Sequence, residues 1–198
     1  VLVCHDSVGR IGGFSTIEVT EHEFRNERVG ILFSGDTIIR HEFWSRNDLA
    51  FSWIDFASRE KLRKPDRPLF WLLIVKGHRT YRYLGVFGKR YYPSPGHEAP
   101  EPALALMDSL ADSRFGDACD PSTGLIRFPD ERGFLRQPWA EIPSTALKRP
   151  EVAYFMERNP DYAEGVELVC LCEVDRSNMK PLTRRIFDKA AEDVVFDS

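Results

Sequence analysis

The chain has 198 residues and a mass of 22.8 kDa, which is the size of one domain with one sizeable core. Its 42% hydrophobic and 29% charged residues exclude a largely disordered protein. The longest apolar run, residues 69–75, is far shorter than the roughly 18 residues that span a membrane, so we expect no membrane span.

Charge is spread unevenly along the chain. Residues 1–99 hold 15 Lys and Arg against 12 Asp and Glu, a net charge of +3, which suits a phosphate-bearing ligand and is too weak to indicate nucleic acid. Residues 100–198 hold 12 against 19, a net charge of -7. That acidic half is either a solvated surface or a region that attracts a cationic acceptor.

Cysteine usage favours a reducing, cytoplasmic setting. Four cysteines in a chain of this length do not form a disulfide scaffold. Cys170 and Cys172 are two residues apart in a predicted strand and therefore share a face, which predicts a pair in the core. The chain begins at Val1 without a basic region or an apolar signal segment, so we do not expect a precursor with an intact signal peptide.

The first segments predict β-structure. Residues 1–4 and 10–20 have strand composition with a turn between them, which indicates a hairpin. After a polar connection at 22–28, residues 29–40 predict a strand that Ser34, Gly35 and Asp36 interrupt. A glycine within a strand marks a bulge or a close backbone approach.

The next segments predict a βαβ unit. A polar elbow at 41–46 leads to Asn47 and Asp48, which are typical of a helix start, and helical spacing of apolar residues continues to about Arg63. Residues 69–75 are apolar on both faces, as a central parallel strand is.

The remaining pattern predicts a mixed α/β fold within a single domain, with a surface loop at 96–102. We expect helices at 77–87, 103–114, 145–158 and 176–191, and strands at 125–128 and 166–174.

An interrupted strand followed by a helix start can hold an anion beside an extended arm. The bulge leaves backbone N–H groups unpaired, and a helix start adds N–H groups at the positive end of its dipole. We expect a pyrophosphate over the N–H groups of Ser45, Arg46, Asn47, Asp48 and Leu49. An amide-bearing arm would pair with the strand edge at Ile38, Ile39 and Arg40.

Coenzyme A has that shape, and the element order resembles the middle of the GNAT superfamily of acyltransferases. Residues 40–49 stand where that family has a strand end and its phosphate loop, with Trp44, Asn47 and Leu49 in place of an Arg or Gln and two glycines. The resemblance implies a GNAT-like mixed, centrally splayed β-sheet flanked by helices. Residues 1–95 would form the acyl-CoA-binding part and residues 96–198 the acceptor-side part.

The resemblance also implies an activity. Such an enzyme transfers an acyl group from acyl-CoA, acetyl-CoA or a carrier thioester to an amine on a small molecule or a peptide, without a metal. In the family a tyrosine often protonates the leaving thiolate, seven residues after a strand-end Asn. Tyr83 stands seven residues after Lys76, and Tyr81 is a competing choice. The alternative for both is an ordinary aromatic cluster.

An amine acceptor must lose a proton before it attacks, which requires a general base. Asp36 is the first choice because the bulge lies where the thioester would sit, and Glu42 and His41 are the other options. The alternative for Asp36 is a structural one, in which its side chain hydrogen-bonds its own backbone in a turn.

Three questions stay open at this point. The basic residues between 59 and 67 either reach an outer phosphate or form a solvated helix end, which we favour. The enzyme could serve natural-product biosynthesis or resemble an acyl-homoserine-lactone synthase. The competing class is a GNAT-like binding module without catalysis, which the missing glycines favour.

Overall fold

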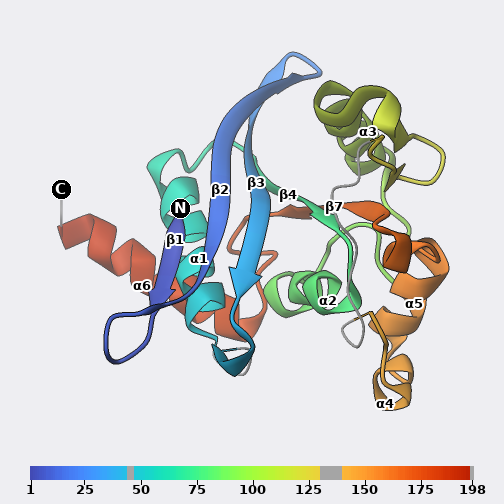
Figure 1. Ribbon diagram of the computed structural model, residues 1–198. Coiled ribbons are helices and arrows are strands. Elements are labelled where there is room, and N and C mark those ends of the chain that lie inside the picture. The colour runs from blue at the N-terminus through green and yellow to red at the C-terminus, as the bar shows by residue number, and fades with distance from the viewer. Residues whose placement is uncertain (44–46, 130–139, 197–198) are drawn as a thin grey trace. The chain divides into compact units, whose positions relative to one another are not determined.

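A computed structural model describes residues 1–43, 47–129 and 140–196. The protein is a mixed α/β protein with a seven-stranded, mostly antiparallel open sheet and flanking helices (Figure 1). The strand order is β1-β2-β3-β4-β7-β6-β5. Two compact units divide the chain, the first comprising residues 1–72, 87–89 and 173–198 and the second residues 73–86 and 90–172. None of the helices in the described ranges is long and apolar enough to cross a membrane.

The first unit begins with three antiparallel strands, β1 (Leu2–His5), β2 (Ile11–Phe24) and β3 (Glu27–Ile39). β2 and β3 continue to a two-residue turn at Arg25 and Asn26, both left-handed with φ of 51° and 66°. Such a turn matches the twist of a hairpin. The prediction of a polar connection at 22–28 is therefore wrong, because polar side chains on an exposed ribbon are compatible with strand pairing.

β3, α1 (Asp48–Arg63) and β4 (Leu69–Val75) form the expected βαβ unit. The Gly30 N–H donates to the Pro68 carbonyl at 2.8 Å, and the Trp71 indole N–H donates to the Ser34 hydroxyl at 2.9 Å. Contacts therefore advance along both strands together, so β4 runs in the same direction as β3 over this stretch. A parallel pair needs a crossover, and α1 provides it.

The core of the first unit is aromatic. Trp53 of α1 lies 4.2 Å from Trp71 of β4 between ring centroids, and both rings meet Phe87 edge-on. α1 also packs along α6 (Pro181–Phe196), as Figure 1 shows. The predicted start of α6 at 176 is wrong, because Asp175 accepts hydrogen bonds from the Ser177 N–H and hydroxyl and holds the preceding residues in a turn.

The second unit contains most of α2 (His78–Phe87) and most of β7 (Glu167–Glu173). Its other elements are α3 (Glu101–Phe115), β5 (Cys119–Asp120), β6 (Leu125–Ile126), α4 (Ser144–Leu147) and α5 (Pro150–Arg158). The helix predicted at 145–158 is thus two helices. Pro150 lacks an N–H and stands at the start of α5, where no intrahelical partner is lost.

The core of the second unit contains the fully buried side chains of Tyr81, Phe155, Leu168 and Leu171. Cys170 and Cys172 are 0% and 1% exposed, so the predicted core pair is confirmed. Burial raises the pKa of the Cys170 thiol, which keeps it protonated.

We predict that two of the four thiols react in the native protein. Cys4 and Cys119 are half-buried, whereas Cys170 and Cys172 are inaccessible. Titration with a chromogenic disulfide reagent at pH 8 should label two thiols per chain, and the other two only in denaturant. Native labelling of all four would contradict the packing of β7. Cys119 should react more slowly than Cys4, because burial and the carboxylates of Asp120 and Asp108 raise the pKa of its thiol.

Candidate functional site

The candidate site is built on a β-bulge in β3. Ile17 pairs with Ser34, but two residues earlier in β2 Ser15 pairs with Thr37. Two residues of β3, Gly35 and Asp36, thus lie opposite the single residue Thr16. This confirms the interruption that the sequence predicts. A Cβ atom on Gly35 would lie 2.4 Å from the Thr16 hydroxyl oxygen, which explains the glycine.

Ser34, directly before the bulge, is anchored to the core. Its hydroxyl accepts the hydrogen bond of the Trp71 indole, whose ring packs on Trp53. The Trp53 indole N–H is itself buried and has no hydrogen-bond partner among the described residues. The residue before the bulge is therefore fixed to the aromatic core through Trp71.

Beyond the bulge the strand is open to solvent. Asp36, Thr37, Ile38 and Arg40 are exposed, and the Ile38 side chain is 59% exposed. The strand stays paired with β2, since the Thr37 and Ser15 hydroxyl oxygens lie 2.8 Å apart and Ile39 pairs with Gly13. The Asp36 carboxylate therefore stands on an ordered, solvent-facing backbone.

The elbow after β3 is held against β2. The Arg40 N–H donates to the Gly12 carbonyl at 2.9 Å, and the 3-10 turn His41–Phe43 follows. The Phe43 ring covers Gly12 so closely that a Cβ atom there would lie 2.5 Å from the ring. Glu42 is exposed, with its carboxylate 3.8 Å from the Arg40 guanidinium. Trp44, Ser45 and Arg46 lie outside the described residues.

α1 begins where the sequence predicts. Asn47 occupies the N-cap position, although its side chain makes no capping hydrogen bond, and Asp48 is the first helical residue. The Leu49 side chain is buried in the core. A ligand at this end would therefore meet Leu49 only through its backbone N–H.

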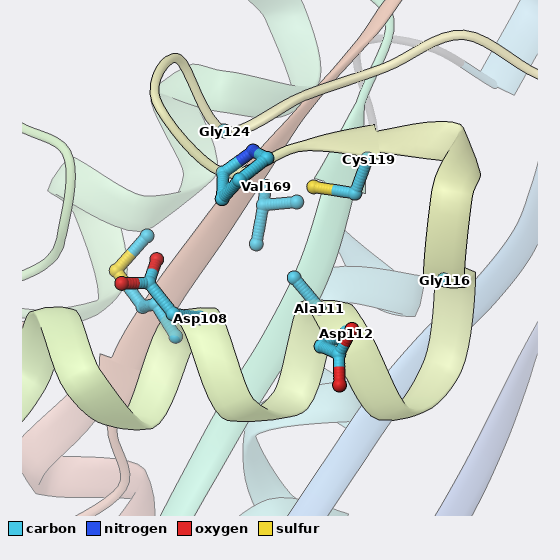
Figure 2. A pocket seen from close by; sticks show the side chains of 9 residues that line it. Asp108, Ala111, Asp112, Gly116, Cys119, Gly124 and Val169 are labelled. Carbon is cyan, nitrogen blue, oxygen red and sulfur yellow. The ribbon is translucent and has the colours of Figure 1, made fainter.

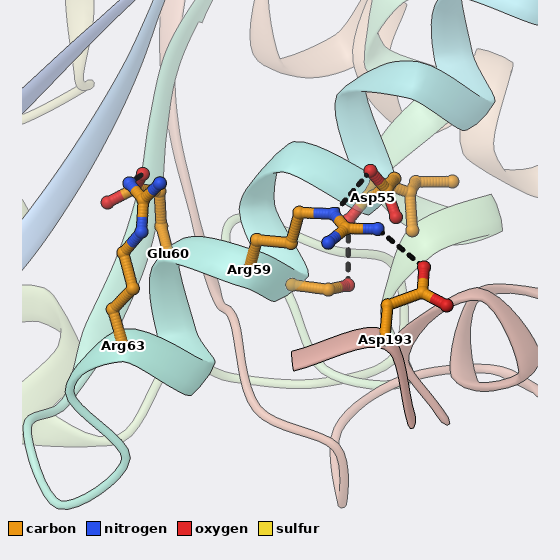
Figure 3. Close-up of polar contacts among 7 residues, drawn as sticks. Asp55, Arg59, Glu60, Arg63 and Asp193 are labelled. Atoms are coloured by element: carbon orange, nitrogen blue, oxygen red, sulfur yellow. Dashed lines mark hydrogen bonds and ion pairs between the residues drawn. The ribbon is translucent and has the colours of Figure 1, made fainter. Parts of the chain in front are cut away.

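The basic run between 59 and 67 is engaged within the protein (Figure 3). Arg59 bonds Asp55 and reaches across to Asp193 of α6 at 2.7 Å, and Arg63 pairs with Glu60. The Lys61 ammonium donates to two backbone carbonyls, and Lys64 and Arg67 both pair with Glu21 of β2. These contacts favour a structural role over an outer-phosphate site.

The two candidate tyrosines of α2 differ sharply. Tyr81 is 0% exposed, and its hydroxyl donates to the Pro93 carbonyl at 2.7 Å. Burial raises its pKa far above the ordinary range. Tyr81 thus lies in the aromatic cluster of the second unit, beside Tyr91 and Phe155. Tyr83 is 42% exposed, which leaves it the accessible one of the two.

Comparison with protein-family models, curated proteins and solved structures finds no match. Among residues 1–43, 47–129 and 140–196, no group of three or more His, Cys, Asp and Glu side chains is arranged to hold a metal ion. The assignment of function therefore depends on the geometry of this chain.

Sequence reasoning missed two contacts that shape the site. It did not predict the hydrogen bond from Trp71 to Ser34, or the packing of the Phe43 ring on Gly12. The paired glycines 12 and 13 within a strand pattern were the available signal for the second, because strand glycines mark close approach.

Replacement of the two tyrosines should separate their roles. Tyr81→Phe removes a buried donor and leaves the Pro93 carbonyl without it, so we expect the free energy of unfolding to fall by about 1–3 kcal/mol. Tyr83→Phe should change it by less than about 0.5 kcal/mol. Urea denaturation of both variants measures this, and an equal effect on both would contradict the placement of Tyr81.

His78 at the start of α2 predicts a pH dependence of stability. It is buried, and burial, with Arg79 and Arg82 nearby, lowers its pKa from 6.5 to about 4. Between these values the unfolded chain binds the proton and the folded protein does not. The free energy of unfolding should therefore fall as pH drops from about 6.5 to 4, by at most about 1.4 kcal/mol per pH unit.

The control is His78→Gln, which cannot titrate. Denaturation curves of both proteins at pH 7, 5.5 and 4.5 should show the wild type losing stability relative to this variant as pH falls. A constant difference across the three pH values would exclude the predicted shift.

Proposed function

We propose that the protein is an acyltransferase that moves an acyl group from acyl-CoA, or from an acyl carrier thioester, to an amine. The observation that carries the proposal is the bulge at Gly35 and Asp36, with the exposed strand end and the start of α1 following it. The order of hairpin, bulged strand, elbow, helix, apolar strand and tyrosine-bearing helix also agrees with the GNAT resemblance.

The donor thioester would lie along the end of β3. Backbone groups at Ile38 and Ile39 would meet the amides of the pantetheine arm, whereas the Arg40 N–H and C=O are already bonded to Gly12 and Phe43. The N–H groups at Asn47, Asp48 and Leu49 would face the diphosphate at the positive end of the α1 dipole. Asn47 supports this orientation, because its side chain makes no capping hydrogen bond to the first turn of the helix.

Asp36 would act as the general base. Its position on a solvent-facing bulge allows a proton from the ammonium form of the acceptor to pass to the carboxylate, directly or through water. The free amine then attacks the thioester carbonyl, the C–N bond forms, the C–S bond breaks, and the departing thiolate takes up the proton that the amide nitrogen loses. Glu42, in the 3-10 turn that follows β3, is the second candidate carboxylate. The tyrosine general acid stays a prediction, for which Tyr83 has the accessible hydroxyl.

A binding module without catalysis is the second candidate. The buried Leu49 side chain, where the resemblance places a glycine, favours it. Both candidates require a thioester ligand, and only the acyltransferase releases thiol when an amine is added.

The test measures binding and thiol release separately. Calorimetric titration with acetyl-CoA and acyl-CoAs of increasing length should give a dissociation constant for at least one donor. Thiol release in the presence of a panel of primary amines should then follow. Binding without release would support the binding module, and the absence of binding by every thioester would refute both.

Asp36→Asn tests the base, and Glu27→Gln, an exposed carboxylate at the other end of β3, is its matched control. We expect Asp36→Asn to lower the rate of thiol release by roughly 10²- to 10⁴-fold at unchanged donor affinity. Glu27→Gln should leave both unchanged. Equal rates in the two variants would remove Asp36 from the mechanism.

A further inference from the structure

The second unit contains a small cavity beside α3 that shares no residue with the thioester site proposed above. Its volume is about 70 Å³. Figure 2 shows Ala111 of α3 on one side, with Val169 of β7 and the Cys119 side chain across from it. Met107 and Pro121 complete an apolar lining.

Two carboxylates stand at the wall of this apolar cavity. Asp108 and Asp112 follow each other by one turn of α3 and therefore share a face of the helix (Figure 2). Both residues are exposed, and within the described ranges neither carboxylate has an ion-pair partner. Like charges one turn apart repel each other. The α3 face thus presents two unpaired negative charges next to a mainly apolar cavity.

We propose that this cavity binds a short aliphatic ammonium ion. The alkyl chain would displace water from Ala111, Val169 and Met107, while the ammonium group would lie between Asp108 and Asp112 and relieve their repulsion. The Asp108 carboxylate also acts on the Cys119 thiol. Burial raises the pKa of that thiol, and the negative charges of Asp120 and Asp108 raise it further.

The size of the cavity limits the ligand. An apolar cavity of about 150 Å³ holds benzene, so about 70 Å³ holds a chain of roughly two to four carbons. That chain length fits both a free short alkylamine and the end of a lysine side chain. An anion of equal size would meet the two carboxylates, and we expect it to be rejected.

Methionine methyl resonances provide the test. The chain has three methionines, and only Met107 lines the cavity, so Met156 and Met179 serve as internal controls. Titration of protein labelled with ¹³C-methyl methionine with n-propylammonium chloride should move the Met107 resonance in a saturable way and leave the other two in place. Propan-1-ol should bind more weakly, and propionate should not bind.

Asp108→Asn and Asp112→Asn should each weaken n-propylammonium binding roughly two- to five-fold. Asp66→Asn, an exposed aspartate of the first unit, is the matched control and should change nothing. Ala111→Leu should fill the cavity and abolish binding. N-acetyl-lysine methylamide tests the lysine source, and the tighter of the two ammonium ligands identifies it.

An unmoved Met107 resonance with both ammonium ligands would overturn the proposal. Equal binding of n-propylammonium and propan-1-ol, or full affinity in both aspartate variants, would also overturn it. These outcomes do not depend on thioester binding, so the proposal and the acyltransferase assignment can fail separately.

Discussion

One extra residue in β3 is the constraint on which the first unit depends. The register between β2 and β3 changes by one residue at Gly35 and Asp36. Because side chains alternate along a strand, this insertion reverses which face each later residue occupies. Before it, the neighbouring residues Ile31 and Leu32 are both buried, whereas Asp36 in the bulge and the following Thr37 and Ile38 are all exposed. The strand therefore has both faces covered before the bulge and both faces open after it, so the bulge marks the point where the core strand becomes accessible.

The aromatic core holds this transition in place. Trp71 contributes a hydrogen bond to Ser34 on one side and ring contacts to Trp53 and Phe87 on the other. Trp53 belongs to α1, so one cluster fixes the strand before the bulge and the helix after the elbow. Phe43 on Gly12 ties the elbow itself to β2. The bulged strand and the start of α1, the two ends of the proposed thioester site, are therefore held in place by the protein's own packing before any ligand binds.

The sequence predicted this region well because its signals are local. Gly35 within an apolar strand marked the bulge, and Asn47 and Asp48 marked the helix start within a residue. Signals that depend on distant partners were less informative. Tyr81 and Tyr83 look alike in sequence, and only the Pro93 carbonyl and the rings around Tyr81 distinguish them. The break at Pro150 was readable in principle but was outweighed by helical spacing on both sides.

The cross-strand contacts of β2 and β3 test the central claim most directly. Inter-strand nuclear Overhauser effects in the isotope-labelled protein should connect Ile17 with Ser34 and Ser15 with Thr37, which places two residues opposite Thr16. A single unbroken register, with Ser15 opposite Asp36, would contradict the account. In that register Asp36 would be an ordinary ladder residue, and the geometric basis for a thioester site would be lost.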